Sequence, residues 1–438
     1  MAEDVKVPEG WRRVRLGEIS EIVKGITYKS SDYCESEEGA TFINLKCILK
    51  KGGFNKDGLK YFKGLIRESQ ILRKGDIIIA IVDLTRDGDI IGYPLRVPDF
   101  GSNKVVTMSM DVVKIEPDAQ IDKAFLYYRL CLNDIHSYIL SISAGSTVLH
   151  LDLNWLPQLE FSVPLSLPEQ HKIAEILETL DNTIEKTDAI IEKYKHIKQG
   201  LMQDLLTRGI DENGQIRSEE THRFRDSPLG RIPEEWKVVE LGEVCEINPE
   251  KVEYSSIKIV KYIDIESVKD GKITTYKIFT KNNAPSRAQR LVKEKDIIVS
   301  TVRPNLKSFA IVTKEFDNFV CSTGFAVLRA KEEKVHPTYL FYLTFYDDVF
   351  LAQILPIIVG SNYPAINSYD VYELIIPLPP LPEQKRIASI LSQIDKTIEK
   401  EQKYKEKLGR IKRGLMEDLL TGKVRVNHLI EEGERNEN

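Results

Sequence analysis

The sequence lacks the marks of a membrane, secreted or zinc-binding protein. No apolar run approaches the roughly 20 residues that cross a bilayer, and the N-terminus carries no signal peptide. The five cysteines share no short spacing, which argues against a disulfide framework and a thiolate zinc site. The seven histidines form no His-x-x-x-His pair. We therefore expect a soluble, cytoplasmic protein with reduced thiols and no metal site.

The sequence also lacks the usual signatures of nucleotide-dependent catalysis. It contains no Gly-x-x-x-x-Gly-Lys-Ser/Thr phosphate loop and no glycine-rich strand-to-helix turn. Asp76 and Asp296 precede apolar strands without a partner acid, histidine or metal-ligand spacing, so we interpret both as turn residues. The formal charge of −5 and the pI near 6.0 argue against a diffuse basic surface. Any contact with DNA must then rest on local patches.

One long segment is present in two copies. Each copy begins Leu-Pro-Glu-Gln, at Leu167 and Leu381, and ends Gly-Leu-Met-x-Asp-Leu-Leu-Thr, at Thr207 and Thr421, with no gap between the two alignments. Apolar residues fall at alternating spacings of four and three, which predicts a helix with one seam for a partner helix. The seam residues are Ile173, Leu177, Leu180, Ile184, Ile191, Tyr194, Leu201 and Leu205, and then Ile387, Leu391, Ile394, Ile398, Leu408, Leu415 and Leu419.

The ends of these helices carry their own signals. Pro168 and Pro382 fit the first helical position, and the glutamate that follows each suits the positive end of the helix dipole. Gly209 and Gly422 follow the last leucines as C-terminal stops. At about 1.5 Å per residue, each helix makes a rod of roughly 58 Å, which is too long for an ordinary compact domain.

The duplication extends into the segments between the helices. The openings at Pro8 and Pro233 share Pro-Glu-x-Trp, and the stretches ending in Ala80 and Ser300 share a turn, an aspartate and an apolar strand. We predict an α+β fold with two tandem mixed α/β domains, each followed by a long helix, and the two helices packed as an antiparallel coiled coil. The boundaries are residues 1–166 for the first domain, 167–208 for the central helix, 209–231 for a surface linker, 232–380 for the second domain, 381–422 for the C-terminal helix, and 423–438 for a frayed tail.

This ordered set of motifs resembles the specificity subunit of type I restriction-modification systems. The resemblance rests on the paired Leu-Pro-Glu-Gln helices, the Pro-x-x-Trp openings, the Gly-Leu-Met endings and the segment Ala284-Pro285-Ser286-Arg287-Ala288, and it covers nearly the whole chain. It implies two target-recognition domains that each read one half of a split, asymmetric site in double-stranded DNA. It also implies helices that dock two adenine-N6 methyltransferase subunits, with restriction (motor-nuclease) subunits added to that core.

The resemblance implies a non-catalytic chain. The Asn/Asp-Pro-Pro-Tyr/Phe element of adenine methylases is missing, and Asn248-Pro249-Glu250 does not supply it. We predict no catalytic residue and no cofactor here, and we expect S-adenosylmethionine, ATP and Mg²⁺ on the partner subunits. Two alternatives stay open: a coiled-coil adaptor that binds proteins instead of DNA, and a self-sufficient DNA-modifying enzyme.

Polar loops beside the predicted strands supply candidates for DNA contact, because base edges are read by paired donors and acceptors. The alternative for each single residue is a solvated side chain or a phosphate contact that positions without specifying. The candidates are Tyr28, Lys29, Lys46, Arg86, Ser146, Thr147 and His150 in the first domain, and Arg287, Arg290, Arg303, Asn305, Lys307, Ser361, Asn362 and Tyr363 in the second.

A second set of residues lies beside the helix seam and is assigned to the subunit interface. Gly200 and Gly414 lie inside the two predicted helices, where each costs about 1 kcal/mol relative to alanine. Their presence in both copies predicts close helix approach at a crossing or docking point. The interface candidates are Ile176, Ile190, Ile197 and Gly200 in the first helix and Ile390, Tyr404, Ile411 and Gly414 in the second.

Overall fold

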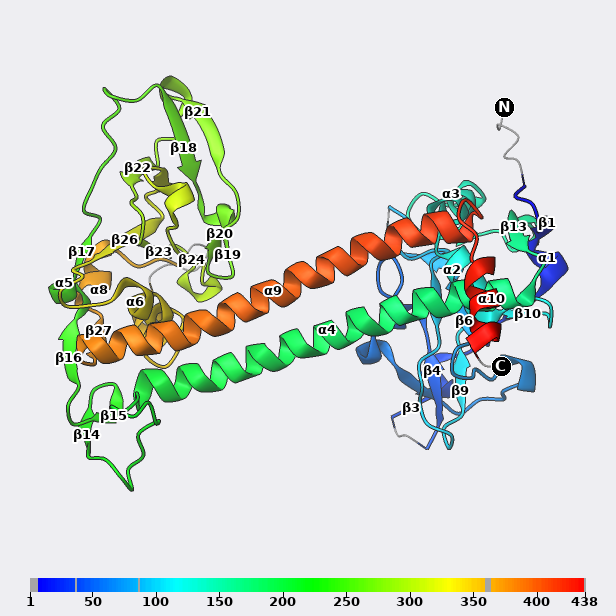
Figure 1. Cartoon of the computed structure of the whole chain (residues 1–438), viewed down its shortest axis with the longest axis horizontal. Coiled ribbons are helices and arrows are strands. Elements are labelled where there is room, and N and C mark those ends of the chain that lie inside the picture. The colour runs from blue at the N-terminus through cyan, green and yellow to red at the C-terminus, as the bar shows by residue number, and fades with distance from the viewer. Residues whose placement is uncertain (1–6, 36–37, 86, 359–363, 437–438) are drawn as a thin grey trace. The chain divides into compact units, whose positions relative to one another are not determined.

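The computed structural model describes residues 7–35, 38–85, 87–358 and 364–436 of the chain. The chain divides into two compact units, one made of Met1–Asp188 with Tyr404–Asn438 and the other of Ala189–Lys403. Each unit holds one globular domain and a part of both long helices, α4 (Leu167–Thr207) and α9 (Leu381–Leu420) (Figure 1). No helix in the described ranges is long and apolar enough to cross a membrane.

The first domain is built on a four-stranded antiparallel sheet in the order β2-β10-β6-β8. Strand β6 is buried on both faces, which explains its unbroken apolar sequence. Ile77 and Ile79 face a core formed with helices α2 and α3 and the start of α4, whereas Ile78 faces a second core. The bounds are β2 (Ser20–Lys24), β6 (Ile77–Ala80), β8 (Pro94–Arg96), β10 (Val112–Pro117), α2 (Lys123–Leu130) and α3 (Asn133–Ser141).

Three smaller sheets complete the first domain. The second core is covered by a sheet in the order β3-β5-β4-β9, in which β4 and β9 run parallel. A pair, β1 and β13, leads into α4, and a sheet β11-β12-β7 carries the turn at Gly145. The bounds are β1 (Trp11–Arg15), α1 (Leu16–Ile19), β3 (Tyr33–Cys34), β4 (Ala40–Ile43), β5 (Lys60–Phe62), β7 (Val82–Asp83), β9 (Val106–Met108), β11 (Ser143–Ala144), β12 (Leu149–Leu151) and β13 (Glu160–Pro164).

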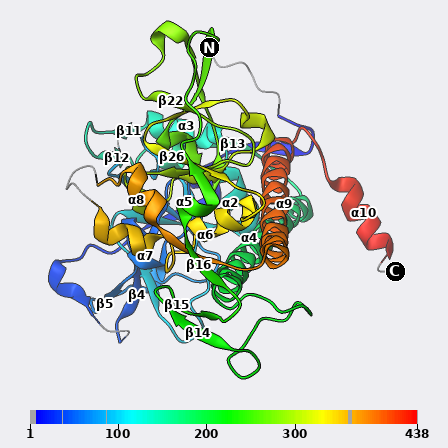
Figure 2. The same ribbon diagram turned by 90° about the vertical axis from the view of Figure 1, so that its left-hand side faces the viewer.

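The second domain repeats the central sheet in the same order, β17-β26-β23-β24. Helix α6 lies beside this sheet (Figure 2). The aromatic side chains of α6 join Ile297, Val299 and Phe309 in one core. The bounds are β16 (Lys237–Glu240), α5 (Leu241–Val244), β17 (Cys245–Ile247), β23 (Ile297–Ser300), β24 (Phe309–Ile311), β26 (Phe325–Ala330), α6 (Pro337–Thr344), α7 (Leu351–Ile354), α8 (Ser368–Glu373) and β27 (Ile375–Leu378).

A second sheet of this domain has the order β21-β18-β25-β22, again with one parallel pair, β18 and β25. A small hairpin, β19-β20, interrupts the connection from β18 to β21. The bounds are β18 (Ile259–Ile263), β19 (Val268–Lys269), β20 (Lys272–Ile273), β21 (Lys277–Thr280), β22 (Ala288–Leu291) and β25 (Val320–Ser322).

Within each unit the two long helices pack antiparallel, as the sequence predicts. In the first unit, Lys412 pairs with Asp181 at 2.5 Å, and Lys405 pairs with Asp188 at 2.5 Å, so a step forward along α4 matches an equal step backward along α9. In the second unit Lys198 pairs with Asp395 at 2.7 Å. Seam residues at the helix ends are buried in the domain cores, and the predicted α+β fold is confirmed.

Two predicted segments differ from the structure. The expected surface linker 209–231 contains strand β14 (Phe224–Ser227), which forms a hairpin with β15 (Gly230–Pro233), and its Arg217 is buried. The expected frayed tail contains helix α10 (Asn427–Asn436), preceded by the buried Val426. Part of this order comes from distant contacts, of Arg217 with Glu383 and of Val426 with the core of the first domain, which local pattern does not reveal.

The helix ends require smaller corrections. Each long helix begins at its leucine, so Pro168 and Pro382 occupy the second helical position and not the first. At the start of α4, the Ser166 hydroxyl accepts a hydrogen bond from the Glu169 backbone amide at 3.4 Å. The stops at Gly209 and Gly422 are confirmed by their positive φ angles of 64° and 73°. Gly200 and Gly414 do not lie at a close crossing of the described helices, since a Cβ at either position would meet no atom of another described element within 4 Å. Close approach of a docked partner at these positions stays a prediction.

Candidate nucleic-acid interface

The repeated Leu-Pro-Glu-Gln motif anchors each helix to its own unit. In the second unit, the Glu383 carboxylate accepts hydrogen bonds from Arg217 at 2.5 and 3.1 Å, from the Ile210 amide at 2.9 Å and from the Trp236 indole at 3.3 Å. The charge is therefore neutralised and its lone pairs are used, as burial of a carboxylate requires. Gly209 is needed here because a Cβ would lie 2.1 Å from this carboxylate.

The first unit has an equivalent buried carboxylate, Glu169. We call the contact of this carboxylate with its arginine, and that of Glu383 with Arg217, a clasp. Arg425, which follows α9, donates to Glu169 at 2.6 and 2.8 Å and also to the Glu9 carbonyl. The indole nitrogen of Trp11, unlike that of Trp236, is buried without a partner among the described residues. In each unit, the segment that follows one long helix is thus pinned to the start of the other.

The glutamine of the motif joins the helix to the globular domain. Gln170 accepts from the Asp122 amide at 2.8 Å and donates to the carbonyls of Gln120 and Pro164. Gln384 does the same with the His336 amide at 2.8 Å and two carbonyls. The motif recurs because each unit has the same buried polar groups to satisfy.

A tyrosine, an aspartate and a lysine lock the helix pair to each domain. The Tyr128 hydroxyl donates to Asp181 at 2.7 Å, and Lys412 pairs with the same carboxylate. Burial and the Asp181 carboxylate both raise the pKa of Tyr128 well above its ordinary value. In the second unit Tyr342 donates to Asp395 at the same 2.7 Å, with Lys198 as the cation.

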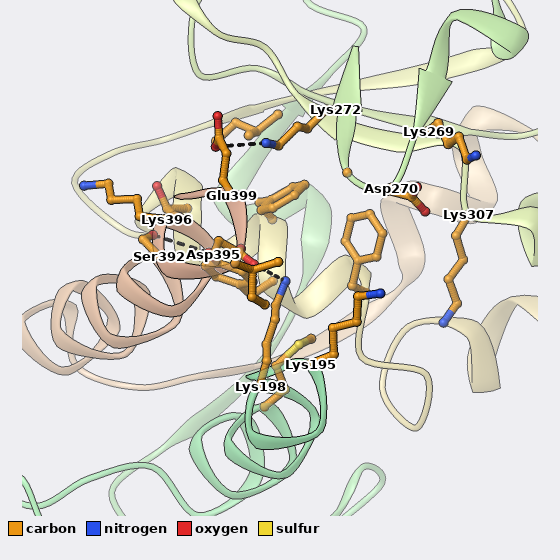
Figure 3. A pocket seen from close by; sticks show the side chains of 18 of the residues that line it. Lys195, Lys198, Lys269, Asp270, Lys272, Lys307, Ser392, Asp395, Lys396 and Glu399 are labelled. Atoms are coloured by element: carbon orange, nitrogen blue, oxygen red, sulfur yellow. Dashed lines mark hydrogen bonds and ion pairs between the residues drawn. The ribbon is translucent and has the colours of Figure 1, made fainter. Parts of the chain in front are cut away.

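A cavity of about 1320 Å³ lies between the long helices and the globular domain of the second unit. Figure 3 shows lysines and carboxylates projecting into it from α4, α9 and the β19-β20 hairpin. Its lysines are largely paired, with Lys272 on Glu399 at 3.0 Å and Lys307 on Asp347 at 2.5 Å. Because the cations and carboxylates offset one another, this cavity is not a site for a polyanion.

The two aspartates before the buried strands are structural, as predicted. Asp76 accepts from the Arg73 amide at 2.8 Å and pairs with Lys123 at 2.9 Å. Asp296 accepts from the Lys293 amide at 2.8 Å and pairs with Arg329 at 2.8 Å. Among the residues that the structure describes, no cluster of histidine, cysteine or carboxylate side chains could hold a metal ion.

The structure brings several predicted DNA contacts of the first domain together. The exposed Ser146, Thr147 and His150 lie on the β11-β12 hairpin, and His150 pairs with Val82 of β7 in the strand register. The loop that follows β7 is held by the buried Asp83, which accepts from the amides of Thr85, Ile90 and Ile91. Burial alone would raise the pKa of Asp83, but these hydrogen bonds outweigh burial and hold it below its ordinary value. Arg86 lies outside the described residues.

The other candidates of the first domain lie on its second sheet. Lys29 and Lys46 are exposed, and Lys46 follows β4 in a turn capped by the buried Asn44. Tyr28 is half-buried and packs edge-on against Tyr33 and Phe42, at centroid distances of 5.1 Å each. Its ring therefore contributes to the domain core, whatever its hydroxyl contacts.

In the second domain, the loop after β23 matches the loop after β7. Arg303 and Asn305 are exposed there, and the Arg303 amide donates to the Pro364 carbonyl at 2.7 Å. Lys307 is half-buried and points into the cavity described above, where Asp347 holds it. Ser361, Asn362 and Tyr363 lie outside the described residues.

Arg287 and Arg290 differ although they are close in sequence. Arg287 is exposed, whereas Arg290 is half-buried, with one guanidinium nitrogen 3.4 Å from the Ser368 hydroxyl and the other buried without a partner in the described part of the chain. Burial lowers the pKa of Arg290. The structure brings Arg290, Ser368 and Asn248 together, since Asn248 donates to Ser368 at 2.9 Å.

A stronger electrostatic signal, which the motifs above did not include, lies along the second sheet of each domain. Residues 271–293 contain six lysines and arginines and no acidic residue, although the chain as a whole is acidic. Residues 39–56 of the first domain contain four lysines and no acidic residue. These stretches include β21 and β22 in one domain and β4 in the other. A local count of charge along the sequence would have found these basic stretches, which are typical of nucleic-acid binding, although Lys272, Lys277 and Lys293 pair with carboxylates of other segments.

The residues assigned to the subunit interface occupy equivalent places on the two helices. Ile190 and Ile197 of α4 are exposed, and so are Tyr404 and Ile411 of α9. Ile176 and Ile390 are partly packed against the domain cores. Gly200 and Gly414 are exposed and leave open space beside each helix. Each helix thus presents a similar apolar stripe that its own unit does not cover.

A duplicated α+β domain with a basic sheet, each copy tied to a long helix, defines a tandem DNA-recognition protein. A family model described as the type I restriction modification DNA specificity domain matches residues 8–195 and 233–410. The chain therefore belongs to the specificity-subunit family of type I restriction-modification systems, whose members recognise DNA sequence and are not the catalytic subunits.

Similar proteins span almost the whole chain. The type I restriction enzyme MjaVIII specificity subunit of Methanocaldococcus jannaschii is 29% identical over 434 residues, covering 97% of this chain and 95% of that protein. The EcoBI specificity subunit of Escherichia coli is 22% identical, covering 89% and 80%. The crystal structure of a type I S subunit from M. genitalium has the same fold, with a TM-score of 0.59 at 16% identity over 96% of this chain and 99% of that one.

Proposed function

We propose that each globular domain reads one half of a bipartite, asymmetric target in double-stranded DNA. The observation that carries the proposal is a division within each domain. The central sheet and its helix contacts are the same in both, whereas the basic second sheets differ in strand order and surface. Two different reading surfaces on equivalent frames fit two unrelated half-sites.

We further propose that α4 and α9 set the spacing of the half-sites and dock two adenine-N6 methyltransferase subunits. The equivalent exposed stripes, Ile190 with Ile197 and Tyr404 with Ile411, offer one apolar contact for each copy. Restriction subunits join this core. In the proposed complex, S-adenosylmethionine, ATP and Mg²⁺ are bound by those partners, and this chain contributes no catalytic group.

The decisive experiment is co-expression with a cognate methyltransferase subunit, followed by mapping of N6-methyladenine in the host DNA. The expected result is one bipartite motif with an unspecified gap. Exchange of residues 232–380 for the same domain of a relative should change one half-site and leave the other unchanged. The absence of any modified bipartite motif would overturn the proposal.

The spacing role has its own test. Insertion of whole helical turns into both α4 and α9, with the apolar seam kept in register, should lengthen the unspecified gap. A gap that stays fixed in an active complex would contradict it. Duplex binding by the complex should also weaken steeply with salt, because phosphate contacts release counterions, whereas a protein-only adaptor would show no such binding.

A further inference from the structure

Two isoleucines project from the second domain into solvent. Ile259 of β18 is 62% exposed and Ile278 of β21 is 63% exposed. In the antiparallel register, Ile259 is opposite Thr280 and Lys261 is opposite Ile278. Since paired residues point to the same side of a sheet, these four side chains form one face of a two-stranded ribbon. We name this face the ribbon face.

The opposite side of the ribbon is covered, so the exposure is confined to one face. Val260, Tyr262 and Phe279 alternate with the ribbon-face residues and pack in a small core with Ala288 and Val320. Figure 1 shows the ribbon at the opposite end of the second domain from β27. Ile278 lies on the edge strand β21 and Ile259 on its neighbour β18. Two exposed isoleucines at the edge of a sheet are an aggregation hazard that folded proteins avoid unless the surface has a binding role.

The first domain covers the equivalent ribbon, β4 with β5. An additional strand, β3, pairs with β5. On the face that corresponds to the ribbon face, Thr41 is opposite Tyr61, and Thr41 is buried while Tyr61 is half-buried. Phe42 and Phe62 lie on the other face, as Tyr262 and Phe279 do in the second domain. The bare ribbon face is therefore a property of the second domain and not of the shared frame.

The charge around the ribbon face identifies its partner as a polyanion. Lys258, Lys261 and Lys281 are exposed on or beside it, and Asn282 and Asn283 are exposed at its end. Lys277 lies on the covered side and pairs with Asp264 at 2.5 Å. The Lys261 ammonium also lies over the Phe319 ring, 4.8 Å from its centroid. Apolar methyl groups flanked by exposed lysines match the major groove of duplex DNA, where phosphates flank the thymine C5 methyl groups.

We propose that the ribbon of β18 and β21 enters the major groove of the second half-site and that Ile259 and Ile278 contact thymine methyl groups there. Two strands about 4.8 Å apart fit a groove about 12 Å wide. The lysines contact the flanking phosphates. This inference rests on the proposed function, because it assigns the reading element of one of the two half-sites.

The test uses the assembled complex with a methyltransferase subunit and duplexes that carry the mapped target. Replacing each thymine of the second half-site by deoxyuridine removes one methyl group and keeps the base pairing. The expected result is binding about fourfold weaker for each contacted methyl group. The I259S/I278S variant should bind the thymine and deoxyuridine duplexes equally well. Deoxyuridine in the first half-site is the internal control.

A matched variant separates this effect from a general loss of exposed apolar surface. Leu165→Ser changes a residue of the first domain that is also 62% exposed, and it should leave the response to deoxyuridine as in the unmodified complex. Thermal unfolding checks that I259S/I278S is folded. Because both side chains are exposed, its Tm should stay within about 2 °C of the unmodified value.

The outcomes are distinguishable. An unmodified complex that ignores every thymine-to-deoxyuridine change in the second half-site, or a second half-site without thymine, overturns the inference and leaves the proposed function intact. Loss of the methyltransferase subunit from the I259S/I278S complex, with DNA binding by the remaining chain unchanged, identifies the ribbon face as a protein contact and overturns it as well. A complex that modifies no bipartite motif overturns the proposed function itself.

Discussion

The two globular domains share one half of their architecture and differ in the other. Both have a central sheet of the same strand order, a tyrosine that donates to a helix aspartate at 2.7 Å, and a glutamine that joins the helix start to the domain. Their second sheets differ, because the first domain adds β3 beside β5 whereas the second adds β22 beside β25. The half that the two domains share holds the long helices, and the half in which they differ carries the basic stretches.

Changes of sequence should be tolerated in the second sheet of each domain better than in the central sheet. A sheet that packs on α4 and α9 must keep its shape, since a protein core resists changes of volume. A second sheet with one solvent-facing side can change its surface at little cost in stability. The clearest example is Ile278, which is 63% exposed, whereas Tyr61 at the equivalent place of the first domain is half-buried.

The largest expected effect is a difference in stability loss between the two clasps. Glu383→Gln leaves the buried Arg217 guanidinium with only the exposed Glu235, at 3.3 Å, as a counter-ion, at a cost of about 3 kcal/mol in the free energy of unfolding. Glu169→Gln should cost about half as much, because the Arg425 side chain is 30% exposed and the Arg217 side chain only 6%. Urea unfolding of the two variants measures both values, and equal losses would contradict the distinction.

The next effect is specific to the first domain. Asp83→Asn places an amide group against backbone donors and should cost about 2 kcal/mol. Because the folded pKa of Asp83 lies below its ordinary value of about 3.9, its stabilising effect is present above that value and is lost as the pH falls through the folded pKa. Thermal unfolding from pH 7 to pH 3 should show the Asp83→Asn penalty shrinking only at the acid end. A penalty that is constant over this range would contradict the assignment.

A third prediction sharpens the equivalence. Tyr128→Phe and Tyr342→Phe should each lower the free energy of unfolding by about 1.5 kcal/mol, since each removes a hydrogen bond of 2.7 Å to a charged acceptor; Tyr342 also loses a long contact of 3.4 Å with the Ser392 hydroxyl. Tyr346→Phe is the control, because its hydroxyl contacts Asp348 at the surface. The control should change stability by less than about 0.5 kcal/mol. A large difference between the first two variants would show that the domains hold the helices differently.

The smallest effect concerns the two helix glycines. Gly200→Ala and Gly414→Ala should each stabilise the chain by up to about 1 kcal/mol, because the added methyl group meets no described atom and alanine favours the helix. The same variants should weaken capture of the methyltransferase subunit in co-purification if that partner packs closely at these positions. Stabilisation with unchanged capture would remove both glycines from the proposed docking stripe.

Much of the fold could be predicted from the sequence because the signals are local and repeated. The four-three spacing predicts both long helices, and the recurrence of whole motifs predicts two equivalent domains. The apolar run at Ile77–Ala80 predicts a buried strand, and the structure confirms it. Asp76 and Asp296 could be interpreted as turn residues because no second acid, histidine or metal-ligand spacing accompanies either of them in the sequence.

The candidate site was predicted less completely, because surface roles depend on neighbours that are distant in sequence. Arg290 and Lys307 read as exposed loop residues, but one is half-buried beside Ser368 and the other is held by Asp347 in a cavity. Tyr28 is part of an aromatic cluster. The ribbon face could not be found, because Ile259 and Ile278 have the pattern of ordinary core residues.

By itself, the sequence determined the α+β class, the tandem duplication and the long amphipathic helices, since each follows from periodicity or from direct repetition. Only the tertiary structure decided that Arg217 and Arg425 close buried clasps on Glu383 and Glu169, and that one ribbon is bare while its counterpart is covered. The physical reason is that burial and ion pairing depend on which segments meet in space. Arg217 and Glu383, like Arg425 and Glu169, lie far apart in the sequence, and no local pattern connects them.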